Sequence, residues 1–261
     1  MGASTHLHRI EEGINMVVIE KVPTGIKGFD DIVEGGLPRP GITYIIGHPG
    51  VGKTTLALQI LYNRALQGEK GMYVSLTEKK ESVITRYKDF PAFNRLEEFL
   101  QKKQLMFFEA IPTYGLGKDM VISLIDDAFN IAQENSVKNI IFDTVTSLTM
   151  YLRRDEVRTI LSYINDKIYN SKTMGIMIAE LPLYSEVINP PNEEFLCDVL
   201  IVMDYVWIYA GAPKLDVRLI PVKSRVGRVD RRSYIAVISP ETGVEIIGTI
   251  ETEHFTPFRQ G

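Results

Sequence analysis

A short glycine-rich segment has the residue types and spacing of a phosphate-binding loop. It reads GHPGVGKTT and matches the pattern G-x-x-x-x-G-K-[ST] in full. Glycines let phosphates approach backbone N–H groups, the lysine places a point charge against the outer phosphates, and the threonine hydroxyl can ligate Mg²⁺. The predicted binding residues are Gly47, His48, Pro49, Gly50, Val51, Gly52, Lys53, Thr54 and Thr55.

The sequence on either side of this loop predicts the strand and the helix that hold it. Ile42–Ile46 is a short apolar, β-branched run that suits a buried strand, and apolar residues recur at helical spacing over Thr54–Gln67. A strand that turns into a helix directs several N–H groups at the positive end of the helix, where anions bind. We therefore interpret the segment as a phosphate site rather than as an ordinary glycine-rich turn.

A carboxylate follows a later strand in a position that suits a metal ion. Asn139–Phe142 is predicted to be a buried strand, and Asp143 comes directly after it. An aspartate at the carboxyl end of a strand beside a phosphate loop holds Mg²⁺ through its water shell. Alone, Asp143 would be interpreted as a residue that caps a turn, but the upstream loop favours the magnesium role. The predicted metal residues are Thr54 and Asp143.

Length and composition fit a soluble enzyme-sized domain, and by length the chain could form one large domain or two small ones. The chain has 261 residues, 45% hydrophobic and 24% charged, without an internal repeat. A net charge of −4 argues against a surface that binds nucleic acid throughout, although it leaves room for a local basic site. The one cysteine, Cys197, stands among apolar residues, which predicts a buried thiol in a reducing cytoplasm. No segment has the roughly 18 uninterrupted apolar residues of a membrane span.

Amphipathic segments alternate with apolar runs, and this alternation predicts an α/β fold. Further helices are predicted over Asp119–Gln133 and Asp155–Asn170, each with one apolar face. Most of the first strands are apolar throughout, as in a parallel sheet covered on both faces: Ile42–Ile46, Met72–Leu76, Leu105–Glu109, Asn139–Phe142, Gly175–Ala179 and Val199–Val202. The later strands are predicted to form antiparallel hairpins at the sheet edge: Trp207–Tyr209, Leu215–Val222, Ser233–Ile238 and Val244–Ile247.

Five further motifs accompany the phosphate loop. They are TGI-x-GFD at Thr24–Asp30, GGLP at Gly35–Pro38, GMYVSLTE at Gly71–Glu78, IFDTVTS at Ile141–Ser147 and VKSRVG at Val222–Gly227. With them, the chain resembles the KaiC-like branch of the RecA superfamily of ATPases. The resemblance implies a RecA-like P-loop core, with a mainly parallel central sheet flanked by helices and C-terminal antiparallel hairpins. It also implies a homo-oligomeric ring, usually a hexamer, that holds ATP and Mg²⁺ between subunits.

The most basic stretch, Lys223–Arg232, has three interpretations. Its five cations and one anion would suit contacts with nucleic acid, or simply the solvated face of an edge hairpin. By the resemblance, Lys223 and Arg225 look like the Lys-x-Arg pair that reaches the γ-phosphate of ATP on the adjacent subunit, as an arginine finger does. We take this third interpretation as the site prediction and keep the other two open.

The catalytic base departs from the pattern of the family. RecA-like ATPases have a glutamate after the strand that follows the phosphate-loop helix, where it orients and deprotonates the attacking water. The KaiC-like pattern has two consecutive glutamates there, whereas this chain has Thr77 and then Glu78. Either Glu78 assumes the role or hydrolysis is slow. The predicted catalytic residues are Glu78, Lys53, Lys223 and Arg225.

These expectations describe a cytoplasmic Mg-ATP-dependent ATPase whose nucleotide state signals to a client protein that the sequence does not identify. The domain is expected over residues 17–248, between tails at 1–16 and 249–261. Leu183–Phe195, where recombinases place a DNA-binding loop, carries glutamates and no Lys or Arg, so nucleic acid is not favoured as a partner. Two alternatives stay open: a recombinase paralogue that modulates DNA recombination or repair, and an ATP-sensing scaffold without appreciable hydrolysis.

Overall fold

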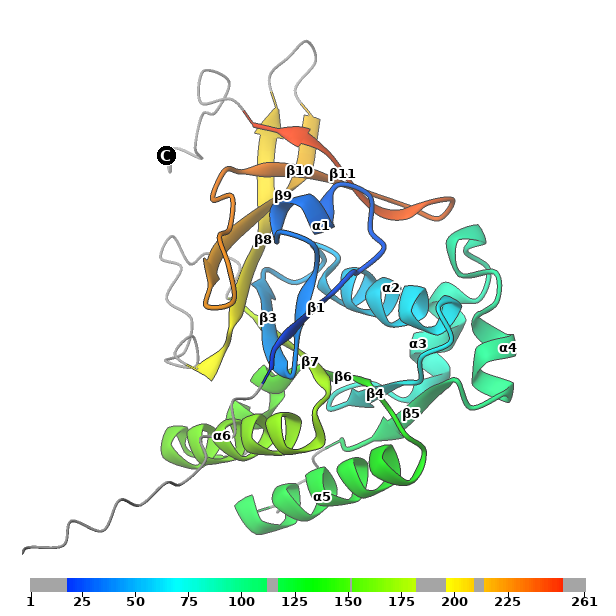
Figure 1. The fold of residues 1–261 in the computed structure, drawn as a ribbon, viewed down its shortest axis with the longest axis vertical. Helices are drawn as coiled ribbons and strands as arrows, with labels where there is room; N and C mark the ends of the chain where they lie inside the picture. Colours follow the sequence, from blue (N-terminus) through cyan, green and yellow to red (C-terminus); the bar gives the residue numbers. More distant parts are fainter. Residues whose placement is uncertain (1–17, 112–116, 151, 182–195, 209–213, 251–261) are drawn as a thin grey trace, which may run out of the picture.

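A large mixed sheet organises the protein. The structure, a computed structural model, describes residues 18–111, 117–150, 152–181, 196–208 and 214–250. Its strands are β1 Glu20–Val22, β2 Leu37–Arg39, β3 Gly41–Gly47, β4 Gly71–Ser75, β5 Leu105–Glu109, β6 Asn139–Asp143, β7 Met174–Glu180, β8 Val199–Ile208, β9 Lys214–Ser224, β10 Tyr234–Ser239 and β11 Gly243–Thr249. Nine of these described strands lie in the order β11-β10-β9-β8-β3-β7-β6-β4-β5, and β1 pairs with β2 separately (Figure 1).

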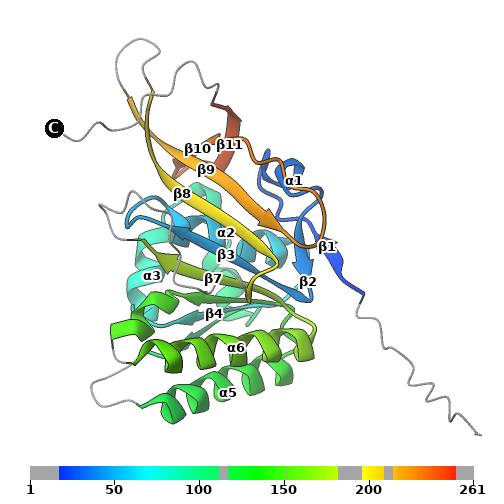
Figure 2. The same cartoon turned by 90° about the vertical axis from the view of Figure 1, so that its left-hand side faces the viewer.

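Helices lie against both faces of this sheet. They are α1 Phe29–Ile32, α2 Lys53–Leu66, α3 Lys80–Tyr87, α4 Leu96–Gln101, α5 Lys118–Glu134 and α6 Arg154–Ser171, with short 3-10 helices at Pro91–Phe93 and Val145–Met150. Figure 2 shows α5 and α6 side by side along one side of the sheet, with α2 on the other. Pairing from β8 through β5 is parallel, and the pairs β8–β9, β9–β10 and β10–β11 are antiparallel.

Alternating residues of the central strands build one hydrophobic core on each face. Ile45, Tyr73 and Ile141 pack in the core that contains α2, whereas Tyr44 and Ile140 pack in the core that contains α5 and α6. Successive side chains of a strand point to opposite faces, so a strand buried on both sides must be apolar at nearly every position. This explains the continuous apolar runs of the sequence, and it confirms the predicted fold class.

The predicted elements match the observed ones closely, with one clear correction. The three predicted helices correspond to α2, α5 and α6, within one residue at each end. Val199–Val202 and Trp207–Tyr209 were predicted as separate strands, but Val199–Ile208 is a single strand. The gap between the two predicted strands is wrong. Asp204, which lies in that gap, pairs with Arg218 across the hairpin at 2.8 and 2.5 Å, so the strand continues through this charged residue. The buried Cys197 agrees with its prediction.

Gln59 links the phosphate-loop helix to the antiparallel edge of the sheet by hydrogen bonds. This buried side chain accepts a hydrogen bond from Val244 N at 2.5 Å and donates to the carbonyls of Thr242 and Val244, each at 3.3 Å. We expect Gln59→Ala to lower the free energy of unfolding by about 1–3 kcal/mol, because a buried N–H group loses its acceptor. Chemical denaturation measures this loss.

The matched control is Gln133→Ala, on the exposed face of α5. It should change the stability by no more than about 0.5 kcal/mol. Equal stability of the Gln59→Ala variant and the wild type would show that the hairpin is held by its apolar contacts alone.

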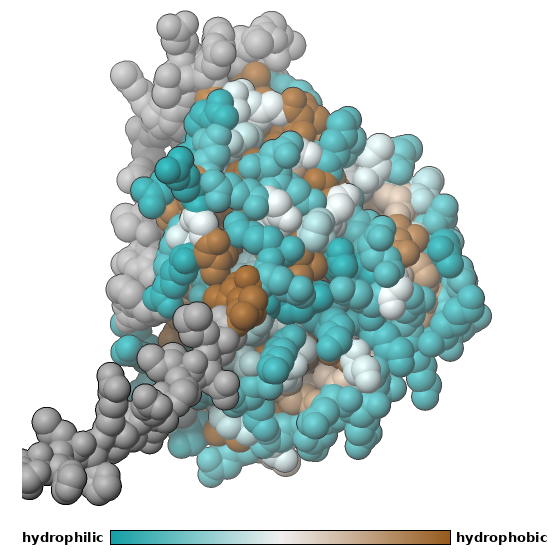
Figure 3. Space-filling view, in the orientation of Figure 1, coloured by the Kyte–Doolittle hydropathy of each residue, from teal (hydrophilic) through white to brown (hydrophobic). Residues whose placement is uncertain are grey.

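The outer surface is largely hydrophilic on the side that Figure 3 shows, with hydrophobic residues in small separate groups. Within the described ranges, none of the helices combines the length and the hydropathy that crossing a bilayer requires. The predicted tails lie outside the described residues except at 249–250, where β11 continues to Thr249. The proposed limits of the domain therefore stay a prediction.

Candidate functional site

The phosphate-binding segment forms the turn between β3 and α2, as the sequence predicted. Gly50 and Gly52 have φ angles of 83° and 91°, in the left-handed region that side chains disfavour. A Cβ on Gly52 would also lie 2.1 Å from Ile238 Cδ1, and one on Gly50 would lie 2.9 Å from the Tyr205 hydroxyl. Glycine is therefore required twice over, by the turn and by the strands β8 and β10 that pack against it.

Lys53, the first residue of α2, folds back over the loop. Its ammonium donates to the carbonyls of Gly47 at 3.0 Å and His48 at 2.8 Å, and the residue is 5% exposed. Burial lowers the pKa of Lys53, and the negative charges of Glu180 and Asp143 oppose this shift. The chain thus holds one cation at the mouth of the loop, with two carboxylates close enough to act on it.

Thr54 and Asp143, the two predicted metal residues, lie together. The Thr54 hydroxyl donates to Asp143 Oδ2 at 2.7 Å, and the Tyr73 hydroxyl donates to the same oxygen. Burial raises the pKa of Asp143, and the hydroxyl hydrogen bonds oppose the rise. The pairing of β6 with β7 and of β7 with β3 brings these residues together, because parallel strands place their carboxyl ends at one edge of the sheet.

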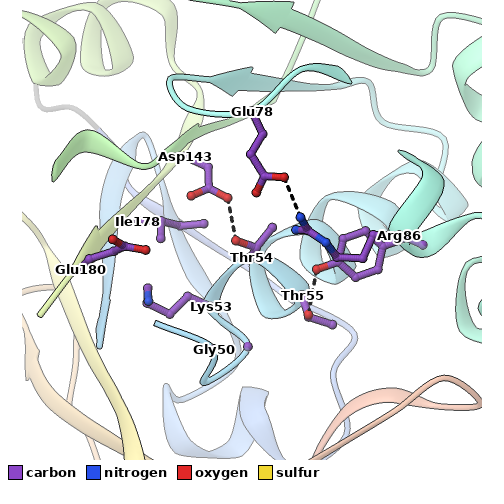
Figure 4. Close-up of a pocket in the computed structure, with 11 residues that line it drawn as sticks. Gly50, Lys53, Thr54, Thr55, Glu78, Arg86, Asp143, Ile178 and Glu180 are labelled. Atoms are coloured by element: carbon purple, nitrogen blue, oxygen red, sulfur yellow. Dashed lines mark hydrogen bonds and ion pairs between the residues drawn. The ribbon is translucent and has the colours of Figure 1, made fainter. Parts of the chain in front are cut away.

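A cavity of about 350 Å³ opens at this edge. Its lining combines phosphate-loop residues with Asp143 and with residues from three other elements, namely Glu78, Arg86, Tyr87, Ile178 and Glu180 (Figure 4). The hydroxyls of Thr55 and Tyr87 are 2.9 Å apart and share a hydrogen bond. The predicted loop, metal aspartate and Glu78 therefore converge in one cavity.

Of the two consecutive positions after β4, only Glu78 reaches the cavity. Thr77 is exposed and is not among the described residues that line it. Ser75 fixes the turn, since its hydroxyl donates to the Glu78 carbonyl at 2.5 Å and accepts from the Glu78 N–H group at 3.1 Å. The Glu78 carboxylate accepts a hydrogen bond from Arg86 at 2.6 Å, so the candidate base is held by a guanidinium of its own chain.

Sequence reasoning missed Arg86, Tyr87 and Glu180. Glu180 follows directly after the predicted strand Gly175–Ala179, so the rule that selected Asp143, a carboxylate at the carboxyl end of a parallel strand, would have found it. Arg86 and Tyr87 lie at the end of α3, a helix that the sequence analysis did not predict. No comparable signal marked them.

Lys223 and Arg225 lie far from the cavity of their own chain. Lys223 pairs with Leu200, and Leu200 pairs with Tyr44, three residues before Gly47. That separation is about 10 Å along the strand, away from the phosphate loop. The Lys223 ammonium instead donates to the Cys197 carbonyl at 2.9 Å. The two cations therefore require the site of another subunit if they are to contact phosphate.

The remaining predictions for the site concern the acidic segment and the metal ion. The acidic segment Leu183–Phe195 lies outside the described residues. Within those residues, no group of three or more His, Cys, Asp and Glu side chains is arranged to hold a metal ion. A cation at Thr54 and Asp143 would thus take its other ligands from phosphates and water, as Mg²⁺ does in sites of this kind.

Comparisons with known proteins bear on the family and on the fold of the chain. The model of a family described as "ATPase: KaiC" matches residues 22–251. A UPF0273 protein of Thermotoga maritima is 28% identical over 200 residues, which cover 72% of this chain and 81% of that protein. The circadian clock oscillator protein KaiC of Prochlorococcus marinus is 28% identical over 201 residues, 73% of this chain but only 39% of that protein. The chain thus spans about two fifths of the length of this KaiC.

A solved structure shows the same fold. The KaiC-like protein PH0186 from Pyrococcus horikoshii superposes with a TM-score of 0.75 and 23% sequence identity, over 88% of this chain and all of the other. At that identity the likeness concerns the arrangement of helices and strands. It supports the α/β architecture that positions the cavity.

Proposed function

Because this chain belongs to the KaiC family of ATPases, within the RecA-like superfamily, we propose that it binds Mg-ATP at the phosphate loop and hydrolyses it slowly. The observation that carries the proposal is the meeting of Lys53, Thr54 and Asp143 at one cavity. We further propose that the chain assembles into a homo-oligomeric ring, in which its nucleotide state regulates a client protein.

The loop backbone, Lys53 and the pair of Thr54 and Asp143 have separate tasks in this proposal. The backbone N–H groups of the loop, which Pro49 lacks, would bind the phosphates, and Lys53 would turn from the carbonyls of Gly47 and His48 to the outer phosphates. Thr54 and Asp143, which are hydrogen-bonded to each other at 2.7 Å, would hold Mg²⁺ together, Thr54 through its hydroxyl oxygen and Asp143 through the water shell of the ion. Bound there, Mg²⁺ would neutralise charge on the outer phosphates.

We expect slow hydrolysis because the Glu78 carboxylate already has a partner. It accepts a hydrogen bond from Arg86 at 2.6 Å, so it must leave this partner before it can contact an attacking water. Both side chains are partly exposed, at 40% and 46%, so the pair can open. Glu78 can therefore reach a water for only part of the time, which favours slow hydrolysis.

ATP binding and turnover test the proposal directly. Calorimetry should detect ATP binding that depends on Mg²⁺, and phosphate release at saturating ATP should be slow but measurable. Binding without phosphate release would favour the ATP-sensing scaffold instead. Repeating both measurements with single-stranded and duplex DNA at two salt concentrations tests the recombinase-paralogue alternative, because contacts with phosphates weaken as salt rises.

Thr77→Glu should increase the rate of hydrolysis. The substitution restores the first carboxylate of the pair. Because Thr77 is exposed and does not line the cavity, the gain should be smaller than the about 10²–10⁴-fold of a well-placed general base, but still measurable. Steady-state phosphate release measures the effect, with Thr77→Gln as the uncharged control of similar size.

Glu78→Gln completes this comparison. Loss of the residual rate would identify Glu78 as the base, whereas an unchanged rate would assign the proton transfer to another group. Rapid hydrolysis by the wild type, combined with no gain from Thr77→Glu, would contradict the idea that Thr77 limits turnover.

A further inference from the structure

Three carboxylates reach the cavity, and two of them already have partners. Asp143 accepts hydrogen bonds from Thr54 and Tyr73, and Glu78 is paired with Arg86. Glu180 is exposed at the end of β7 and lines the same cavity. Among the described residues, none donates a hydrogen bond to its carboxylate. Within the described part of the chain, Glu180 is thus the cavity carboxylate that receives no hydrogen bond from another side chain.

The backbone places Glu180 beside the phosphate loop with little freedom. Glu180 is paired with Gly47 in the parallel register of β3 and β7, and adjacent strands are about 4.8 Å apart. Its N–H group donates to the Thr146 hydroxyl at 2.8 Å, and the next N–H group, of Leu181, donates to the Gly47 carbonyl at 2.9 Å. The same Gly47 carbonyl accepts from the Lys53 ammonium. The backbone of Glu180 is therefore one strand spacing away from Gly47, whose carbonyl Lys53 contacts.

Glu180 and Glu78 lie on different sides of the site. In Figure 4, Glu180 and Lys53 are on one side of Thr54 and Asp143, and Glu78 and Arg86 are on the other. Since Lys53 is the residue that meets the outer phosphates, Glu180 is the carboxylate at that end of the cavity. The charge of Glu180 also acts on Lys53, more strongly than the charge of Asp143 does.

A carboxylate cannot contact a phosphate anion directly without strong repulsion, so a water molecule between the two is the favoured arrangement. On the basis of the proposed function, we propose that Glu180 is a catalytic residue that accepts a proton from the water that attacks the terminal phosphorus of ATP. The water oxygen forms the new bond to phosphorus. The bond from phosphorus to the bridging oxygen breaks and ADP leaves with the electron pair, while the water proton passes to the Glu180 carboxylate.

The test measures ATP binding and turnover separately. Glu180→Gln should lower kcat by about 100-fold, within the range of a general base. Calorimetry should show that its affinity for Mg-ATP is unchanged or tighter, because a negative charge near the phosphates is removed. Glu180→Asp, which keeps the carboxylate, should retain more of the rate than Glu180→Gln. Glu134→Gln, on the exposed surface of α5, is the control and should match the wild type.

Failure of this inference and failure of the proposed function would give different results. Wild-type kcat in Glu180→Gln, or complete loss of turnover in Glu78→Gln with little loss in Glu180→Gln, would overturn this inference and leave the proposed function standing. A wild type that does not bind ATP would overturn the proposed function as well. Equal thermal stability of the variants and the wild type would exclude unfolding as the cause of a lost rate. If Glu180→Gln is unstable, the kcat of Glu180→Asp provides a second test of the same side chain.

Discussion

Arg225→Ala is expected to lower ATP hydrolysis by about 10³-fold while changing ATP binding little, because an arginine that completes the site of a neighbour acts mainly on charge in the transition state. Arg225 follows β9, at the end of the sheet opposite to the phosphate loop of its own chain. Phosphate release at saturating ATP gives the rate, and calorimetry gives the affinity. Arg231→Ala removes an exposed cation from the same basic segment and is the matched control.

Mixing two inactive variants tests whether Arg225 acts between subunits. An Arg225→Ala subunit has an intact phosphate loop, and a Lys53→Ala subunit has an intact Arg225. Where the two meet, one interface can contain every group that the reaction needs, so the mixture should recover some activity. No recovery in subunits shown to assemble together would mean that Arg225 acts within its own chain or takes no part in hydrolysis.

Lys53→Ala should weaken ATP binding by about 100-fold, since it removes a charge-assisted contact worth a few kcal/mol. Turnover should fall at least as far, because the same charge stabilises the transferred phosphoryl group. The fold should survive, as the described hydrogen bonds of the Lys53 ammonium go to the carbonyls of Gly47 and His48 within its own loop.

Calorimetry with ATP, together with thermal unfolding, checks the prediction for Lys53. The control is Lys138→Ala, an exposed lysine just before β6, at the opposite end of the strand from Asp143. Equal ATP affinity of the wild type and Lys53→Ala would contradict the assignment of the phosphate site.

Local sequence was sufficient where a segment has a long and regular pattern. Helices α5 and α6 each place one apolar stripe against the sheet, and their ends agree with the predicted ones within a residue. Central strands such as β3 are buried at every position, so continuous apolar runs identify them. The phosphate loop was recognisable because its turn uses left-handed φ angles at Gly50 and Gly52, a conformation that favours glycine.

The sequence analysis missed helix α3 and the continuity of strand β8 because their local patterns are weak. Helix α3 has eight residues and buries only Val83 and Tyr87, so its sequence carries little periodicity. It nevertheless brings Arg86 to Glu78. In β8, the charged residue Asp204 lies between the two predicted strands, and its partner, Arg218, is 14 residues away on the next strand. Such pairs stabilise a strand through contacts that a local pattern does not contain.

The sequence by itself predicted the glycine-rich loop between β3 and α2, the candidate metal residues Thr54 and Asp143, and the class of fold, because each depends on residues that are near one another in the chain or on a regular period. Only the tertiary structure decided which carboxylates share the cavity. The order β3-β7-β6-β4 places Glu180 next to the loop, Asp143 one strand further and Glu78 beyond it, beside Arg86. Strand order is set by packing of the whole sheet, so the pairing of Glu78 and the availability of Glu180 appear only when the chain is folded.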